Sequence, residues 1–339
     1  MAASVVGTIT SGAGKVGRYF TVVSALPAAL LTTYACVIVQ AGWSEHVRWS
    51  AIGDMPWYGV LLAGLFALAL ALALNPLQFP LIQLFEGYWG TSALGIALAT
   101  LRTAHHRRRL FALKQSKQEA NSRLEASGRH MLERRTAGSH LIRAAIVANE
   151  TSREASSYPE ARDILPTRLG NVLRRYERLA GRSYLIDPLA AVPRLAMVGS
   201  EQEVAYVQNQ RVQLELALRT SLMAFLGTAV TLVVMSRHGF WLLLALVPYS
   251  VAYLAYRGAV ALAHEYGTSL AVLVDLSRFE LYRRMGLKQP GSTEEERQMN
   301  ATLMKIFEFS ADASLRYEDP PVTLDQALFN FSPAPKEEE

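Results

Sequence analysis

Long apolar runs alternate with charged segments along the chain. Four of these runs hold about 20 residues with few or no charges, the length that a helix needs to cross the hydrocarbon core of a bilayer. A bilayer core admits helices because they satisfy their own backbone hydrogen bonds. The pattern therefore predicts four helical spans, at residues 22–41, 57–74, 216–235 and 240–263.

The connections arrange these spans in two pairs. Only residues 236–239 separate the third span from the fourth, so we expect those two helices to form an antiparallel hairpin. The first two spans are joined by residues 44–56. The expected fold class is an all-α integral membrane protein, with two transmembrane helical pairs and a cytoplasmic helical bundle.

Residues 75–101 leave the number of spans open. This segment has a single charge, Glu86, but Pro76 and Pro80 would bend or break a helix that continues from the second span. We favour an aromatic-rich helix that lies in the membrane interface. The alternative is a fifth span, which would move the N-terminus to the other side of the membrane.

Charge predicts the orientation of the spans. Residues 102–211 contain 20 Lys and Arg against 11 Asp and Glu, whereas residues 44–56 and 236–239 contain one Arg each. Since Lys and Arg beside a span favour the cytoplasmic side, we expect a multi-pass protein of the bacterial inner membrane with both termini in the cytoplasm. Residues 264–339 contain 8 Lys and Arg against 14 Asp and Glu, so we expect this acidic block to dock on the basic one.

Capping signals place helices in the polar segments. Thr167, Ser200 and Ser292 each precede a helical pattern, and the helix that follows Ser200 is expected to run into the third span. Residues 102–158 predict one or two long helices, and residues 181–198, with Pro188 and Pro193, predict an ordered loop or short turns. Five regions result: a transmembrane pair with an interfacial helix (1–101), a basic helical region (102–211), a transmembrane hairpin (212–263), an acidic helical region (264–319) and a mobile tail (320–339).

Composition excludes several kinds of site. The chain has 339 residues, of which 51% are hydrophobic and 19% charged, which favours a membrane protein over a soluble one. Cys36 is the single cysteine, so no disulfide forms within the chain. The histidines lack the spacing of a zinc site, and residues 11–17 only superficially resemble a phosphate-binding loop. We expect no cofactor, no metal and no nucleic-acid partner.

The candidate site residues are charges at the predicted membrane boundary, because such groups are costly there and commonly functional. One set contains the ionisable residues in or beside the spans, with Glu215 and Arg219 on one helical face, where we favour an interfacial structural pair over an ion or proton pathway. The members of this set are Glu86, Glu215, Arg219 and Arg257. The other set is the run Arg107, Arg108 and Arg109, for which we expect contact with anionic lipid headgroups.

Several short segments resemble a group of uncharacterised actinobacterial membrane proteins. They read GRYFTVVSALP, NPLQF, EGYW, PTRLGNVLR and PRL at residues 17–27, 75–79, 86–89, 166–174 and 193–195. The likeness covers most of the chain up to about residue 290. The chain departs from the group at Leu185, where the group has glycine. The resemblance implies no particular activity.

Function is predicted only as a class. We favour a non-enzymatic protein whose cytoplasmic helices mediate assembly into a homo-oligomer or binding of a cytoplasmic protein. The alternative is an oligomeric pore or effector triggered through those helices, since residues 200–285 are similar in architecture to the two-span effector modules of bacterial defence systems. An intramembrane enzyme is disfavoured because the sequence offers no nucleophile, dyad or metal constellation.

Overall fold

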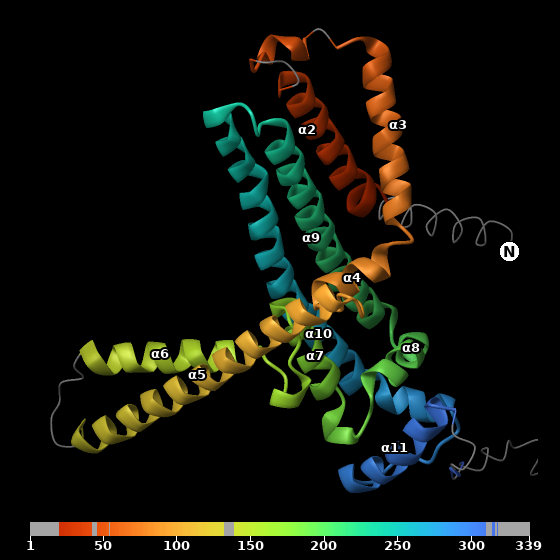
Figure 1. Ribbon diagram of the computed structural model, residues 1–339. Coiled ribbons are helices and arrows are strands. Elements are labelled where there is room, and N and C mark those ends of the chain that lie inside the picture. The colour runs from red at the N-terminus through yellow and green to blue at the C-terminus, as the bar shows by residue number, and fades with distance from the viewer. Residues whose placement is uncertain are drawn as a thin grey trace, which may run out of the picture. The chain divides into compact units, whose positions relative to one another are not determined.

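The computed structural model describes residues 20–42, 46–53, 55–131, 139–309, 314–315 and 317. Within these ranges the chain is helical and has no strand, which confirms the all-α prediction (Figure 1). The predicted tail at 320–339 and the segment 11–17 lie outside the described residues. The α-helices are α2 (Leu26–Gly42), α3 (Trp57–Leu74), α4 (Gln78–Glu86), α5 (Ala93–Met131), α6 (Ser139–Ala155), α7 (Arg168–Leu179), α8 (Pro188–Val198), α9 (Glu201–Val234), α10 (Leu246–Arg284) and α11 (Thr293–Phe307).

Short segments of tighter or wider helix join these elements. A π-helical stretch, η1 (Phe20–Ala25), leads into α2, and a 3-10 segment, η5 (Gly239–Ala245), leads into α10. The others are 3-10 turns: η2 (Trp49–Ile52), η3 (Ala161–Asp163) and η4 (Arg182–Tyr184).

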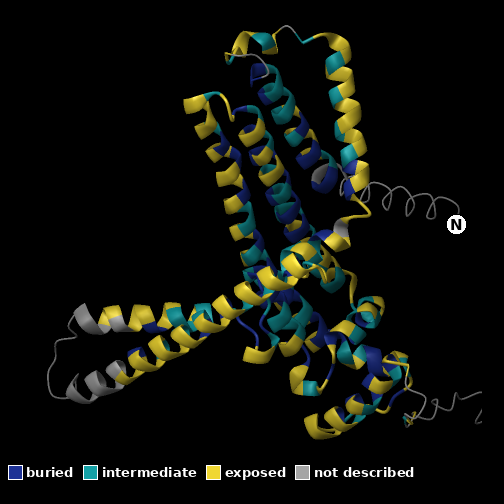
Figure 2. Cartoon of the chain, in the orientation of Figure 1, coloured by how far each residue is buried: buried dark blue, intermediate teal, exposed yellow. Residues whose placement is uncertain are grey.

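Four helical segments of the described chain are long and apolar enough to cross a membrane. They are Val23–Gly42, Trp57–Leu74, Glu201–Val234 and Gly239–Arg284. In the most apolar part of each, 39% of the residues are buried in the third segment but only 11% in the second, so α9 is the central helix and α3 is peripheral (Figure 2). The apolar outer surface of α3 suits contact with lipid.

Residues 75–101 are divided between two helices. After a turn that follows α3, α4 covers nine residues, or about 13 Å at 1.5 Å per residue, which is too short to cross the bilayer core. A new helix, α5, starts at Ala93 and continues far beyond this segment. The structure thus gives no support to a fifth span.

The predicted long helices of residues 102–158 are α5 and α6, which form an antiparallel hairpin (Figure 1). Leu110 of α5 forms a buried cluster with Tyr158 and Ile164, which lie in the segment after α6. An ion pair between Arg109 and Glu154 links α5 to α6 (Nε to Oε1, 2.8 Å).

The chain divides into two compact units. One unit consists of residues 1–178 and 205–269, and the other of residues 179–204 and 270–339. In the second unit, α11 packs on α8 and η4. The predicted contact between the acidic and basic blocks is therefore found for α11.

That contact does not depend mainly on opposite charge. The ring of Phe307 lies under the guanidinium of Arg194, with 3.9 Å from Cζ to the ring centroid. The side chain of Asn300 donates to the backbone oxygen of Tyr184. Glu296 of α11 pairs with Arg278 of α10 (2.8 Å), which belongs to the acidic block itself.

Candidate functional site at the charged end of the spans

Arg219 lies fully within the contact between α9 and the start of the first span. Its side chain is 1% exposed, and it donates to the Ser24 hydroxyl and, at 3.5 Å, to the backbone oxygen of Val23. Ser24 belongs to the π-helical segment η1, so this wider turn supplies the acceptors. The second terminal nitrogen, Nη2, is buried and has no hydrogen-bond partner among the described residues. Arg219 thus links α9 to the first span, but burying Nη2 without a hydrogen-bond partner costs free energy.

Glu215 is also buried, but its partner is different from the one we expected. Its carboxylate pairs with Arg211, one turn earlier on α9, at 2.8 Å from Nε to Oε1. We predicted an interfacial pair of Glu215 and Arg219, but the hydrogen bonds of Arg219 go to Val23 and Ser24 of η1. Arg211 is about half exposed, whereas Glu215 is 3% exposed, so the pair connects a buried carboxylate to the surface.

Arg257 is exposed on the outer face of α10. Its Nη1 lies 3.3 Å from the hydroxyl of Tyr253, four residues earlier on the same helix. Arg257 is thus exposed, whereas Glu215 and Arg219 are buried.

Glu86 is the last residue of α4 and contacts the start of α7. Its backbone oxygen accepts a hydrogen bond from the Thr167 hydroxyl at 2.9 Å. Gly170 faces the same oxygen, and a Cβ atom on Gly170 would lie 2.1 Å from it. Burial and the negative charge of Glu177 raise the pKa of the Glu86 carboxyl to about 7, against the smaller lowering effect of the positive charge of Arg174.

Asn171 holds the loop before α7. Its side-chain amide donates to the backbone oxygens of Leu165 and Thr167, and its side-chain oxygen accepts from the Leu165 amide at 2.8 Å. Thr167 caps the helix by accepting from the Gly170 amide. The segment PTRLGNVLR thus forms the start of α7, is held by hydrogen bonds between its own residues and Leu165, and packs on the end of α4. Sequence analysis noticed this segment only as part of a resemblance and did not predict its role.

The start of α7 also packs beneath the spans. Leu169, Val172 and Leu173 form one buried cluster with residues of α9 and α10. The partners in that cluster are Leu214, Leu218, Ala259 and Ala263. We call this region, in which α4 and α7 meet α9 and α10, the junction.

The three arginines predicted to contact lipid differ in their exposure and in their partners. Arg107 and Arg108 are exposed on α5, whereas Arg109 is only partly exposed and is engaged with Glu154. The residue before them, His106, is 2% exposed, and its Nδ1 shares a hydrogen bond of 3.0 Å with the Tyr158 hydroxyl. Burial and the neighbouring cations, Arg102 first, lower the pKa of His106 to about 4.

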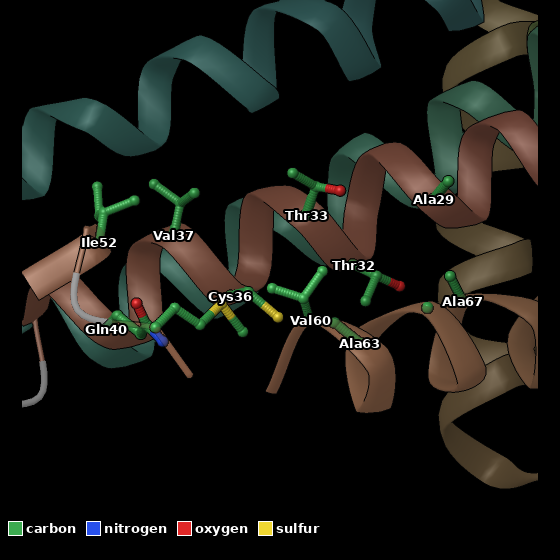
Figure 3. Close-up of a pocket in the computed structure, with 12 residues that line it drawn as sticks. Ala29, Thr32, Thr33, Cys36, Val37, Gln40, Ile52, Val60, Ala63 and Ala67 are labelled. Atoms are coloured by element: carbon green, nitrogen blue, oxygen red, sulfur yellow. The ribbon is translucent and has the colours of Figure 1, made fainter. Parts of the chain in front are cut away.

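Two apolar hollows lie among the spans. The larger, of about 380 Å³, lies between α2 and α3, where Thr33 and Cys36 line it (Figure 3). The smaller, of about 270 Å³, lies between α2, α9 and α10 beside Tyr34 and Gly227. Neither hollow is lined by a charged side chain, so both offer space to an apolar chain rather than to an ion.

The described part of the chain contains no group of three His, Cys, Asp or Glu side chains that could hold a metal ion. In comparisons with known proteins, no family model, no curated protein and no solved structure matches the chain. The resemblance to actinobacterial membrane proteins therefore remains a prediction, and the chemistry of the site rests on the residues above.

Proposed function

We propose that this chain is a non-enzymatic protein of the bacterial inner membrane, whose cytoplasmic helices mediate assembly into a homo-oligomer. The proposal includes the two transmembrane pairs and the orientation that the charge pattern predicts. It is supported by one observation above all, an apolar strip on α6 that the described chain leaves uncovered.

The α6 strip consists of Ile142, Ile146 and Val147. Their side chains are 59%, 53% and 39% exposed, although α6 otherwise carries mostly polar residues on its outer side. Ile142 and Ile146 are four residues apart and share one helical face. Fully burying one such side chain contributes about 1.5–3 kcal/mol to stability. A symmetric contact between two copies of the chain buries these three side chains in each copy.

Charges beside the strip favour a second copy as its partner. Arg143 and Glu150 flank the strip, both are exposed, and neither forms an ion pair with another described residue. A two-fold axis passing between Ile146 and Val147 pairs two antiparallel copies of α6. In that arrangement Arg143 of each copy faces Glu150 of the other, as expected of a self-complementary contact.

We favour assembly over conduction because the buried charged side chains are bound to other residues of the chain. Arg219 is bound within the contact between η1 and α9, and Glu215 is bound to Arg211. A pore would need these groups to face water. An enzyme would need a reactive constellation, for which the described residues offer no candidate.

The test is the mass of the purified protein in a neutral detergent, measured by native mass spectrometry. We expect a dimer or a larger oligomer, and a shift to monomer for Ile146→Glu. Phe111→Ser is the matched control, since Phe111 is a 71% exposed side chain on the other helix of the same hairpin. Its mass should equal that of the wild type.

A charge reversal tests the pairing itself. Arg143→Glu places two carboxylates opposite each other and should weaken assembly, whereas the double variant Arg143→Glu/Glu150→Arg should restore it. A wild-type protein that stays monomeric at all concentrations would refute both assembly and the oligomeric pore, whereas an oligomer that lets ions leak from loaded liposomes would favour the pore.

A further inference from the structure

One side of α8 is apolar and is left uncovered by the described chain. Leu189, Pro193 and Met197 follow one another at intervals of four residues, so they share one side of the helix. Leu189 and Met197 are 64% and 84% exposed, and Pro193 is also exposed. We call these three residues the α8 strip. Exposed apolar side chains gathered on one face are typical of a surface on which another segment docks.

The other side of α8 is already occupied. Arg194 stacks on the ring of Phe307 of α11, and the backbone amide of Asp187, which caps α8, lies 3.3 Å from the sulfur of Met304. The buried residues of α8 are Pro188, Ala191 and Leu195. Since α11 holds α8 by its inner side, the α8 strip stays on the outside of this unit.

The end of the chain carries an amphipathic pattern that suits such a surface. Residues 318–339 lie outside the described residues, but their sequence has apolar positions at the spacing i, i+3, i+4 and i+7. These positions are Leu324, Ala327, Leu328 and Phe331. Thr323 precedes them, with Gln326 three residues later, as in a capping box. Residues 323–331, which we call the tail segment, therefore have the pattern of a short helix with one apolar side.

Tyr317 attaches the beginning of the tail to the unit that contains α8. It forms an isolated β-bridge with Leu287, just after α10. Residues 179–204 and 270–339 belong to the same compact unit, so the bridge and the α8 strip are parts of one body. The tail therefore starts from a fixed point on this body.

The tail segment can reach α8 from that point. The amide of Leu287 donates to the backbone oxygen of Tyr282, whose hydroxyl accepts from Asn300 at 2.7 Å. The same amide nitrogen of Asn300 donates to the backbone oxygen of Tyr184, in the turn before α8. This path contains one tyrosine side chain and three hydrogen bonds. Residues 318–324 can span about 23 Å when extended, which is longer than the path.

We propose that the tail segment docks on the α8 strip of the same chain, with Leu324, Leu328 and Phe331 against Leu189 and Met197. A segment tethered this closely acts at an effective concentration in the millimolar range, so a small apolar contact suffices. The α8 strip, on a helix of 11 residues, is too small for the roughly 1,000 Å² that a stable contact between separate chains buries. Docking would hold part of the tail that we expected to be mobile, and it does not depend on assembly through the α6 strip.

The experiment uses the reactivity of a cysteine in the α8 strip. The reporter is Met197→Cys in a full chain whose Cys36 is replaced by alanine, and its reaction with a maleimide is timed in neutral detergent. Phe331→Glu should raise the rate by at least about fivefold, because a carboxylate is costly to bury against apolar side chains. Phe329→Glu is the matched control, since position 329 lies on the opposite side of a helix from position 331, and its rate should stay within about twofold of the unchanged tail.

A second reporter tests whether the effect is local. Leu276 lies on α10 in the same unit and is 60% exposed, but it is not part of the α8 strip. Leu276→Cys should react at the same rate with every tail variant. A rate that rises equally at both reporters would show that Phe331→Glu loosens the whole unit, and a disulfide between the two surfaces then decides.

That disulfide is formed in Met197→Cys/Leu328→Cys, again with Cys36 replaced by alanine, by oxidation with copper phenanthroline. We expect a bond within one chain, which leaves the protein a monomer on a denaturing gel without reductant. The control pair Met197→Cys/Phe329→Cys should form it several-fold more slowly. A covalent dimer would overturn the proposal in favour of a second copy on the α8 strip. The absence of a bond, or equal rates with Phe331→Glu and Phe329→Glu, would overturn docking of the tail segment.

Discussion

Arg219 and Ser24 form a polar contact between α9 and η1. Both side chains are buried, and one nitrogen of Arg219 already lacks a partner. Removing an acceptor from a buried charged donor costs more than the hydrogen bond contributes, because the donor remains desolvated. The stability of the fold should therefore be sensitive to a single hydroxyl group.

We expect Ser24→Ala to lower the free energy of unfolding by about 1–3 kcal/mol. In an Arg219→Leu background the same change should cost less than about 0.5 kcal/mol, because the buried charge is gone. Unfolding in mixtures of mild detergent and dodecyl sulfate, followed by tryptophan fluorescence, measures both. Equal losses in the two backgrounds would show that the two side chains are not coupled.

His106 gives the α5–α6 hairpin a predicted dependence on pH. Its pKa is about 4 in the folded chain and about 6.5 in an unfolded one, so the unfolded chain binds more protons between these values. Stability is therefore complete above pH 6.5 and is lost as the pH falls towards 4, by up to about 1.4 kcal/mol per pH unit. Hydrogen exchange of α6 amides should show this slope in the wild type and a much smaller slope in His106→Gln.

Among the elements, α4 and α7 meet through a contact that only glycine permits. A Cβ on Gly170 would lie 2.1 Å from the backbone oxygen of Glu86, and a backbone atom has less freedom to move away than the end of a side chain. We expect Gly170→Ala to cost about 3 kcal/mol, at the upper end of the usual cost of overpacking. Thermal unfolding in detergent measures the loss.

Gly258→Ala is the control for this change. Gly258 lies within α10, and a Cβ there would meet nothing within 4 Å. Since alanine is the better helix former, the control should be neutral or slightly stabilising. A similar loss in both variants would mean that the contact between Gly170 and Glu86 does not matter.

Helix starts were predictable from the sequence because they depend on neighbouring residues. Ser200 and Ser292 cap α9 and α11, each accepting a hydrogen bond from the amide three residues later, and α7 starts after Thr167 as expected. Residues 188–198, which we predicted as a loop or turns, form the helix α8 instead. Asp187 caps it and Pro188 occupies its first position, a combination that outweighs the cost of Pro193 within the helix.

Partners distant in the sequence were not predictable in this way. The charges Glu215 and Arg219 stood out because their apolar surroundings make charge costly. The acceptor of Arg219 lies 195 residues earlier, in a serine that carries no signal of its own. Likewise, Glu86 was noticeable as the one charge of its segment, but its contact with Thr167 depends on packing across 81 residues.

For the whole molecule, we predict the orientation in the membrane from where the cations lie. Residues 102–211 are strongly basic, whereas the segment 44–56 contains Arg48 as its one Lys or Arg. With four spans these two segments lie on opposite sides of the membrane, and with five they lie on the same side. Exposed serines in each segment, Ser50 and Ser122, allow the two arrangements to be distinguished.

We expect Ser50→Cys, in a chain whose Cys36 is replaced by alanine, to react with a membrane-impermeant maleimide in intact cells. Ser122→Cys in the same background should react only after lysis. If neither position reacts until the cells are opened, both segments are cytoplasmic and a span must lie within residues 75–101. Reaction at Ser122→Cys alone in intact cells would reverse the orientation, because the basic hairpin would then face outward against the distribution of charge.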